Sequence, residues 1–349
     1  MTSSSSNFYE NLCSPDSESW LNSPETVLIF SHIMALLVTP LHLFGAYCIS
    51  KKTPSTMHSV KLTLLNFHFW NVLVDLMLNV FAIPFPLFPS ASGFLLGLFS
   101  YWGIRQTVQL WILITSLCFI CVSTTMIFEN RFRLLNHKNK HWKKFQPFWV
   151  VGNILFVFIF LIPTMLQVPD QDQARQMVLI KLPCIPDFLY STEIIVPSLN
   201  NDIIVFTALV FILVVFGQLL TFTIVIIVQL SSNFGANLLS ESTRRLQKNL
   251  LKALIWQTGI PLIYLVLPAS LSMLTIPLGI YSRPFNNIIV AVTSLHGLVS
   301  TLSMILIHKP YRSTVAKCWK KKGTGENSRL VNNFPLFSTN TAVGYYVTH

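Results

Sequence analysis

Asp75 is the only acidic residue deep inside an apolar run of this 349-residue sequence. Asn71 and Asn79 lie four residues to either side, a spacing that places side chains on one helical face. An ionisable group within a membrane is costly to bury and usually has a function. The pattern predicts an intramembrane polar or ion-coordinating relay of Asp75, Asn79 and His296. A protonated Asp75 that hydrogen-bonds to a neighbouring helix for packing explains the residues equally well.

Compact catalytic signatures do not occur in the sequence: it has no P-loop lysine motif, no H-E-x-x-H motif and no G-x-S-x-G motif. Cys118 and Cys121 form a C-x-x-C pair, but an apolar run surrounds them and no second pair follows. Small polarizable side chains packed in a helix explain this pair better than a metal or redox site does. We therefore expect no enzyme activity, no metal and no cofactor.

Polar and aromatic side chains near three apolar runs are candidates for binding a small molecule. They are Trp102, Arg105, Gln106 and Gln109 at the start of the third run, Tyr264 in the sixth, and Asn286 at the start of the seventh. Ligand pockets are mostly apolar with a few convergent polar groups. We expect these residues to line an outward-opening cavity between helices 3, 5, 6 and 7. For Arg105, snorkelling to lipid headgroups is an equally good explanation.

The composition places all of these residues in a bilayer. Hydrophobic residues make up 52% of the chain and charged residues 11%, whereas soluble proteins carry about 25% charged residues. A helix crosses the hydrocarbon with about 20 mostly apolar residues. Seven runs are long enough: about 26–49, 60–82, 105–128, 147–167, 203–228, 252–274 and 286–307. Because backbone groups must be paired within lipid, each run is predicted to be a helix. The fold class is therefore an all-α, seven-helix transmembrane bundle.

Basic residues orient this bundle. With the N-terminus outside, 20 of the 24 Lys and Arg residues fall on the inner side, as the positive-inside rule requires. They form blocks between apolar runs instead of one stripe, which opposes nucleic-acid binding. We expect an extracellular segment at 1–23, a transmembrane domain at 24–308 and a cytoplasmic tail at 309–349. A basic amphipathic helix at 310–322 would lie on anionic membrane lipids, with Cys318 as a candidate palmitoylation site.

Charged boxes end the third and seventh runs: F-E-N-R-F at 128–132 and H-K-P-Y-R at 308–312. An acid two residues from an arginine can hold that arginine and release it when helices move, so we expect Glu129 to position Arg131. With P-L-H at 40–42, D-L at 75–76 and L-H-G at 295–297, the boxes make the chain resemble the nematode serpentine chemoreceptors of class H (Srh), from about Leu21 to Arg312.

The resemblance implies a G-protein-coupled receptor for a chemical cue, whose small-molecule ligand is unspecified. Its partner would be a heterotrimeric G protein, and it would be a multi-pass protein of the plasma membrane, with the sensory cilium membrane of neurons as its expected location. A basic inner surface would couple to the G protein through Glu129, Asn130, Arg131, Arg133, Arg244, Arg245, Lys248 and Arg312. Retention by anionic lipid explains some of these charges as well.

Another class of membrane protein also fits seven spans: a ligand-gated channel or transporter. Transporters usually contain internal repeats and several intramembrane charges along a pathway. Here Asp75 is the only charge deep within a span, and seven spans do not divide into two equal halves. A scaffolding protein is a third alternative, but the loops are short for that role. The receptor interpretation is therefore preferred.

Cysteine placement predicts one disulfide. Under the predicted orientation, only Cys13 and Cys184 of the six cysteines face the oxidising exterior, where a disulfide persists. The outer end of the third run contains no cysteine, so a bridge from that position is excluded. We expect a Cys13–Cys184 bond that pins the N-terminal segment across the outer loops. Two unpaired thiols, or pairing with another chain, are the alternatives.

Overall fold

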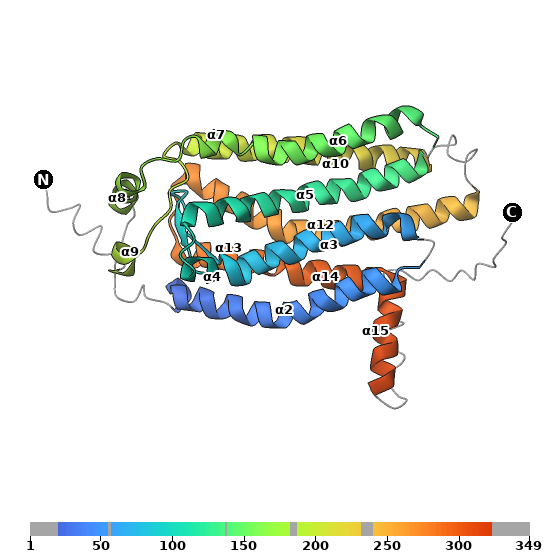
Figure 1. Cartoon of the computed structure of the whole chain (residues 1–349), viewed down its shortest axis with the longest axis horizontal. Helices are drawn as coiled ribbons and strands as arrows, with labels where there is room; N and C mark the ends of the chain where they lie inside the picture. Colours follow the sequence, from blue (N-terminus) through green and yellow to red (C-terminus); the bar gives the residue numbers. More distant parts are fainter. Residues whose placement is uncertain (1–19, 55–56, 137, 182–186, 232–239, 323–349) are drawn as a thin grey trace, which may run out of the picture.

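The computed structural model of the chain describes residues 20–54, 57–136, 138–181, 187–231 and 240–322. Long helices lie side by side along one direction (Figure 1). In chain order the described elements are η2 (Trp20–Asn22), α2 (Pro24–Lys52), α3 (His58–Leu76), η4 (Met77–Phe81), β1 (Pro84–Pro86), β2 (Gly93–Leu95), α4 (Leu98–Tyr101), α5 (Gln106–Leu135), α6 (Lys140–Ile159), α7 (Ile162–Met165), α8 (Gln171–Lys181), α9 (Asp187–Ser191), α10 (Asn201–Ser231), α12 (Glu241–Leu278), α13 (Arg283–Ser294), α14 (His296–Ile307) and α15 (Lys309–Lys322).

Seven helical segments within the described ranges are long and apolar enough to cross a membrane, which confirms the predicted bundle. They are α2, α3 with η4, α5, α6 with α7, α10, α12, and α13 with α14. Three helices extend well beyond the predicted runs: α5 continues to Leu135, α6 already begins at Lys140, and α12 already begins at Glu241. Hydropathy detects the length of chain inside hydrocarbon, whereas a helix continues for as long as its backbone bonds are favourable.

Serine caps fix where several of these helices begin. Ser23, Ser240 and Ser282 each accept a hydrogen bond from the backbone N–H three residues later, at the N-termini of α2, α12 and α13. Such a cap satisfies one of the free N–H groups of the first turn. At the other end of α12, Gly279 adopts a left-handed φ of 63°, a conformation that favours glycine.

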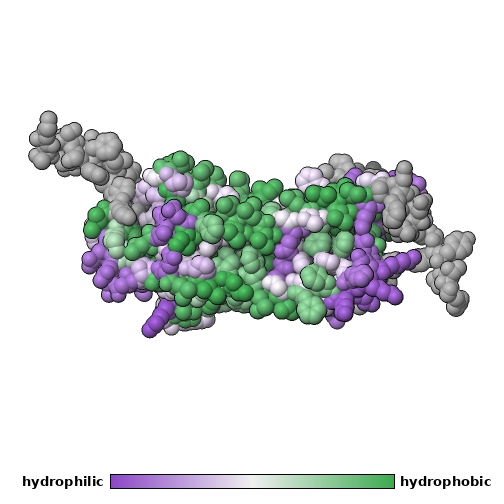
Figure 2. All heavy atoms as spheres, turned by 90° about the horizontal axis from the view of Figure 1, so that it is seen from above, coloured by the Kyte–Doolittle hydropathy of each residue, from purple (hydrophilic) through white to green (hydrophobic). Residues whose placement is uncertain are grey.

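Apolar side chains cover the outside of the bundle between two polar ends. Figure 2 shows hydrophobic residues across the middle of one face and hydrophilic residues gathered toward both ends. Leu36 on α2 and Leu62 on α3 are about three-quarters exposed, at 76% and 75%. A soluble protein rarely exposes apolar patches of this extent, so these faces suit lipid.

A small β-hairpin lies at the end of the bundle where α2 begins. Strands β1 and β2 pair antiparallel with Phe85 opposite Phe94, and Gly93 bridges to Ile195 in the segment before α10. Helices α4, α8 and α9 lie at the same end, and α15 leaves the opposite end across the direction of the spans (Figure 1). We call these the hairpin end and the α15 end. Helix α15 occupies the segment expected to be amphipathic, and its contact with lipid stays a prediction.

Candidate functional site

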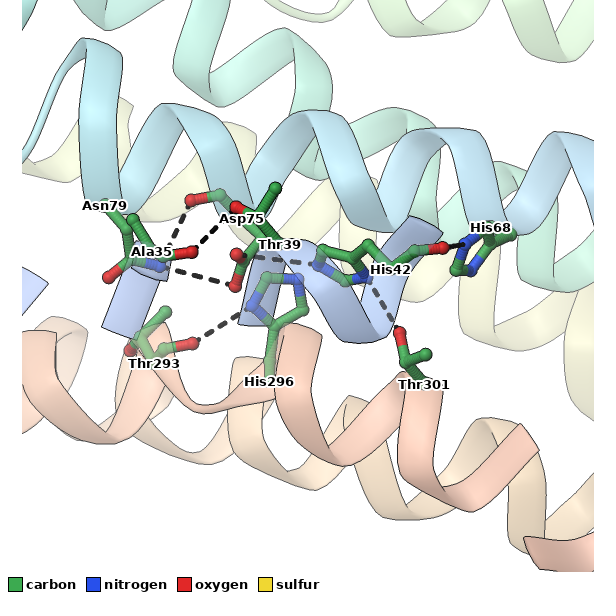
Figure 3. Close-up of polar contacts among 9 residues, drawn as sticks. All are labelled: Ala35, Thr39, His42, His68, Asp75, Asn79, Thr293, His296 and Thr301. Atoms are coloured by element: carbon green, nitrogen blue, oxygen red, sulfur yellow. Dashed lines mark hydrogen bonds and ion pairs between the residues drawn. The ribbon is translucent and has the colours of Figure 1, made fainter. Parts of the chain in front are cut away.

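A cluster of buried polar side chains lies where α2, α3 and α14 meet (Figure 3). Its members are His42, His68, Asp75, Asn79, His296 and Thr301, which we call the polar cluster. His42 Nε2 lies 3.5 Å from Asp75 Oδ2, an ion pair whenever the imidazole is protonated. Asn79 Nδ2 donates to Asp75 Oδ1 at 3.3 Å. The three predicted relay residues are therefore brought together, and a histidine from α2 joins them.

His42 is held from two further directions. Its Nδ1 lies 2.8 Å from Thr301 Oγ1 on α14, and its main-chain carbonyl lies 3.0 Å from His68 Nε2 on α3. Each of these three side chains is less than 5% exposed. Because a buried polar group is costly unless it is hydrogen-bonded, these bonds fix the relative positions of three spans.

His296 stands at the junction of α13 and α14. Its Nδ1 lies 3.1 Å from the Thr293 carbonyl oxygen, and its ring is drawn beside Asp75 and His42 in Figure 3. Its Nε2 has no hydrogen-bond partner among the described residues. Two imidazoles, one from α2 and one from α14, therefore lie around one carboxylate of α3. Within the described ranges, no set of three or more His, Cys, Asp or Glu residues is arranged to hold a metal ion.

At the hairpin end, three of the expected ligand residues bind backbone groups. Gln106 accepts from the Leu95 N–H at 2.7 Å and donates to the Leu95 carbonyl at 3.3 Å. Gln109 is fully buried and donates to the Ile104 carbonyl at 2.8 Å. Asn286 donates to the Phe88 carbonyl at 3.2 Å. These three amides hold the hairpin and the turn before α5 against the spans.

The other three expected ligand residues lie apart from these amides. Trp102 is 59% exposed, Arg105 is exposed at the start of α5, and Tyr264 is half-buried on α12. A pocket of about 500 Å³ lies between α2 and α13, and its lining includes none of the six expected residues. Their contact with a ligand stays a prediction.

At the α15 end, Glu129 and Arg131 do not pair. Glu129 accepts from Trp142 Nε1 at 3.0 Å and lies 3.9 Å from Arg133 Nε, and the described residues contain no ion pair between Glu129 and Arg131. The expectation that Glu129 positions Arg131 is wrong. Residues two apart on a helix point away from each other, whereas residues four apart, such as Glu129 and Arg133, share a face.

Arg131 instead belongs to a buried group contributed by three helices. It is 7% exposed on α5, and its charge acts on the nearby His308, at the junction of α14 and α15. His308 Nε2 lies 2.6 Å from Gln257 Oε1 on α12. Burial, and secondly the charge of Arg131, lowers the pKa of His308 to about 4. We call Arg131, Gln257 and His308 the inner lock.

Neighbouring contacts extend this arrangement to the first two spans. Asn130 Nδ2 donates to Thr63 Oγ1 at 2.6 Å on α3, and the Tyr311 hydroxyl lies 2.7 Å from Thr53 Oγ1. The remaining basic residues of the expected coupling surface lie at the same end on α12 and α15, where they are exposed or half-buried. They are Arg244, Arg245, Lys248 and Arg312.

Sequence reasoning missed His42, Gln257 and His308 as site residues. Each is a polar residue in or beside an apolar run, and that was the available signal. Their partners lie between 26 and 259 positions away, so the sequence does not reveal which contacts they make. Cys13 and Cys184, the expected disulfide, lie outside the described residues, and so does the side chain of Cys318.

Comparisons with known proteins give a family and a fold. The profile described as "Serpentine type 7TM GPCR chemoreceptor Srh" matches residues 22–321. The chain is 27% identical to serpentine receptor class H-72 of Caenorhabditis elegans, over 90% of this chain and 91% of that protein. It is 37% identical to serpentine receptor class r-10 of Caenorhabditis briggsae over 92 residues, 26% of this chain and 27% of that protein. Squid rhodopsin has a similar fold, with a TM-score of 0.50 at 12% identity over 86% of both chains.

Proposed function

We propose that this chain, which belongs to the serpentine type 7TM GPCR chemoreceptor family Srh, detects an external small molecule and signals to a cytoplasmic heterotrimeric G protein. The observation that carries the proposal is the inner lock at the α15 end. There Arg131 of the third span is buried, and its charge acts on His308, which is hydrogen-bonded to Gln257 of the sixth span. A buried charge and a hydrogen bond contributed by separate helices change together when those helices shift.

The hairpin end is proposed to face outside and the α15 end to face the cytoplasm. With the N-terminus outside, 20 of the 24 basic residues of the sequence fall on the inner side of the membrane. The proposed location is the plasma membrane, in particular the sensory cilium membrane. Helix α15 would lie against anionic lipid headgroups through Lys309, Arg312 and Lys317. A tag placed before residue 20 should be reachable on intact cells, and a tag that requires permeabilisation contradicts this orientation.

The proposed coupling surface surrounds the inner lock. Arg133 is 44% exposed beside the buried Arg131, and Arg245 is exposed on the long inner part of α12. Arginine donors suit the carbonyl and carboxylate groups at the C-terminus of a docking helix. Attraction to anionic lipid accounts for other exposed charges, for which Lys143 on α6 is a good example.

Comparison of Arg131→Ala with Lys143→Ala tests this proposal. The measurement is GTPγS binding to a purified heterotrimeric G protein, with the receptor variants reconstituted in nanodiscs and empty nanodiscs as the baseline. Wild type and Lys143→Ala should accelerate nucleotide exchange to the same extent, and Arg131→Ala should lose the acceleration. An equal loss in both variants, at equal receptor content, would indicate general charge instead of a specific contact.

Ligand recognition is proposed at the hairpin end, between the outer thirds of α5, α10, α12 and α13. Trp102 and Arg105 are the accessible candidates, while Gln106, Gln109 and Asn286 would shape the cavity by holding the hairpin. The polar cluster lies between this end and the inner lock, and we propose it as the relay between them. The channel or transporter alternative is not favoured, because the family is one of chemoreceptors.

A further inference from the structure

One side of α12 is exposed along the whole apolar part of the helix. Four large apolar residues recur on it at steps of seven, four and seven positions: Trp256, Ile263, Leu267 and Leu274. Such steps keep side chains on one side of a helix. Each of the four is between 52% and 59% exposed, and α12 is long and apolar enough to span a membrane. This side therefore suits lipid tails, and we call these four residues the lipid face of α12.

The same side of α12 becomes basic toward the start of the helix. Lys252 and Arg245 lie four and eleven residues before Trp256, so helical spacing places both in line with the lipid face. Both are exposed, and no acidic residue of the described ranges forms an ion pair with either of them. Two unpaired positive charges in line with a lipid-facing surface suit a lipid whose headgroup is anionic.

The adjacent Arg244 has a different environment. It is one residue from Arg245 and is therefore turned by about 100° around the helix axis. Its side chain is 22% exposed, and its Nη2 lies 3.5 Å from Glu241 Oε1. The two neighbouring arginines thus serve different surfaces, because Arg244 has an acidic partner within the chain and Arg245 is open to an outside partner.

The inner lock gives the depth of these charges. Gln257 of α12 is hydrogen-bonded to His308, directly before α15, so Trp256 lies at the level where α14 ends. Helix α12 continues past this level (Figure 1). At a rise of 1.5 Å per residue, Lys252 lies about 6 Å and Arg245 about 16 Å further out. The headgroup layer on one side of a bilayer is about 5–8 Å thick, so Lys252 lies within it and Arg245 beyond it.

We infer that the lipid face of α12 binds a phosphoinositide of the inner leaflet. The phosphodiester pairs with Lys252, the inositol phosphates, which stand further from the hydrocarbon, pair with Arg245, and an acyl chain lies along Trp256. Phosphatidylserine fits less well, because its charged groups lie together at one depth. The inference rests on the proposed orientation of the α15 end, and it assigns Arg245 of the proposed coupling surface to lipid.

Native mass spectrometry of the full chain in detergent micelles tests this inference. The probes are phosphatidylinositol 4,5-bisphosphate and phosphatidylserine, supplied at equal total charge, and the wild type should bind the phosphoinositide more tightly. Lys252→Gln and Arg245→Gln should each weaken its apparent affinity about fivefold, which corresponds to about 1 kcal/mol for one basic residue at a membrane surface. Lys140→Gln and Lys143→Gln remove the same charge from exposed positions on α6 and should leave the affinity unchanged.

A second measurement locates the bound lipid. In phosphatidylcholine nanodiscs, a phosphoinositide with a diazirine in its acyl chain should label α12 within 256–267. Equal losses in all four variants would indicate a general effect of charge and overturn the inference, as would equal affinity for phosphatidylserine or labelling spread evenly over α6 and α10. A micelle has no inner or outer side and these assays contain no G protein, so failure of lipid binding is distinguished from failure of the proposed orientation or coupling.

Discussion

Gly297 of α14 lies so close to Asp75 of α3 that a Cβ built on the glycine would be 2.7 Å from Asp75 Cγ. This approach brings the backbone of the seventh span against the carboxylate of the second. Gly45 on α2 has a similar position, since its Cβ would be 2.9 Å from both His68 Cε1 and Thr301 Cγ2. The polar cluster is thus packed between two glycines, and its contacts depend on the absence of their side chains.

Gly297→Ala should destabilise the protein by about 1–3 kcal/mol, because the added methyl group forces α14 away from Asp75. Gly217→Ala on α10 is the matched control, since its Cβ meets nothing within 4 Å and alanine favours a helix. Thermal unfolding of the purified variants measures the difference. Equal midpoints for the two variants would contradict the close packing.

Trp142→Phe should destabilise the α15 end by about 1–3 kcal/mol, because Glu129, 3% exposed, loses the donor of a 3.0 Å hydrogen bond. Arg133→Ala should cost less than about 1 kcal/mol, since that partner is 44% exposed and 3.9 Å away. The free energy of unfolding is the measurement. A larger loss from Arg133→Ala would mean that the ion pair, not the indole, holds Glu129.

Low pH should destabilise the inner lock, because His308 becomes protonated. Its pKa is lowered from 6.5 to about 4 by burial, so protonation opposes the folded state. The contribution of His308 to stability is complete above about pH 6.5 and is lost as the pH falls toward 4. Thermal unfolding of wild type between pH 7.5 and 4 should therefore show a decline that His308→Gln reduces. His141→Gln, an exposed position on α6, should leave the decline unchanged.

Gln106→Leu should release the hairpin, because both polar atoms of the side chain bind the Leu95 backbone. Hydrogen exchange at 93–97 should become at least about tenfold faster, in line with two lost hydrogen bonds. The neighbouring Arg105→Ala, at an exposed position, should leave exchange unchanged. Unaltered exchange in Gln106→Leu would leave ligand contact as the better role for this glutamine.

Alkylation with and without reductant should show one disulfide, between Cys13 and Cys184. In the chain-entropy model, closing so long a loop stabilises by about 4–5 kcal/mol, less any strain in the bond. Mass spectrometry of the labelled thiols identifies the pair. Unchanged thiol counts would establish two free cysteines, and a reductant-sensitive dimer would establish pairing with another chain.

The sequence alone determined that the chain forms seven long apolar helices. Apolar length and the need to pair backbone groups are local properties, so a run such as 203–228 predicts α10 with no knowledge of its neighbours. The polar continuation of α12 from Glu241 was missed for the same reason, since hydropathy does not mark a helix that leaves the membrane.

Tertiary structure alone decided which polar groups meet. Asp75 was conspicuous as a lone intramembrane acid, but its pairing with His42 and its contact with Gly297 depend on how α2, α3 and α14 cross. Gln106 and Asn286 appeared to be ligand residues, yet their partners are carbonyl and N–H groups of a hairpin that no side-chain pattern indicates. Residue types report what a group can bind, while packing between distant segments determines which partner is within reach.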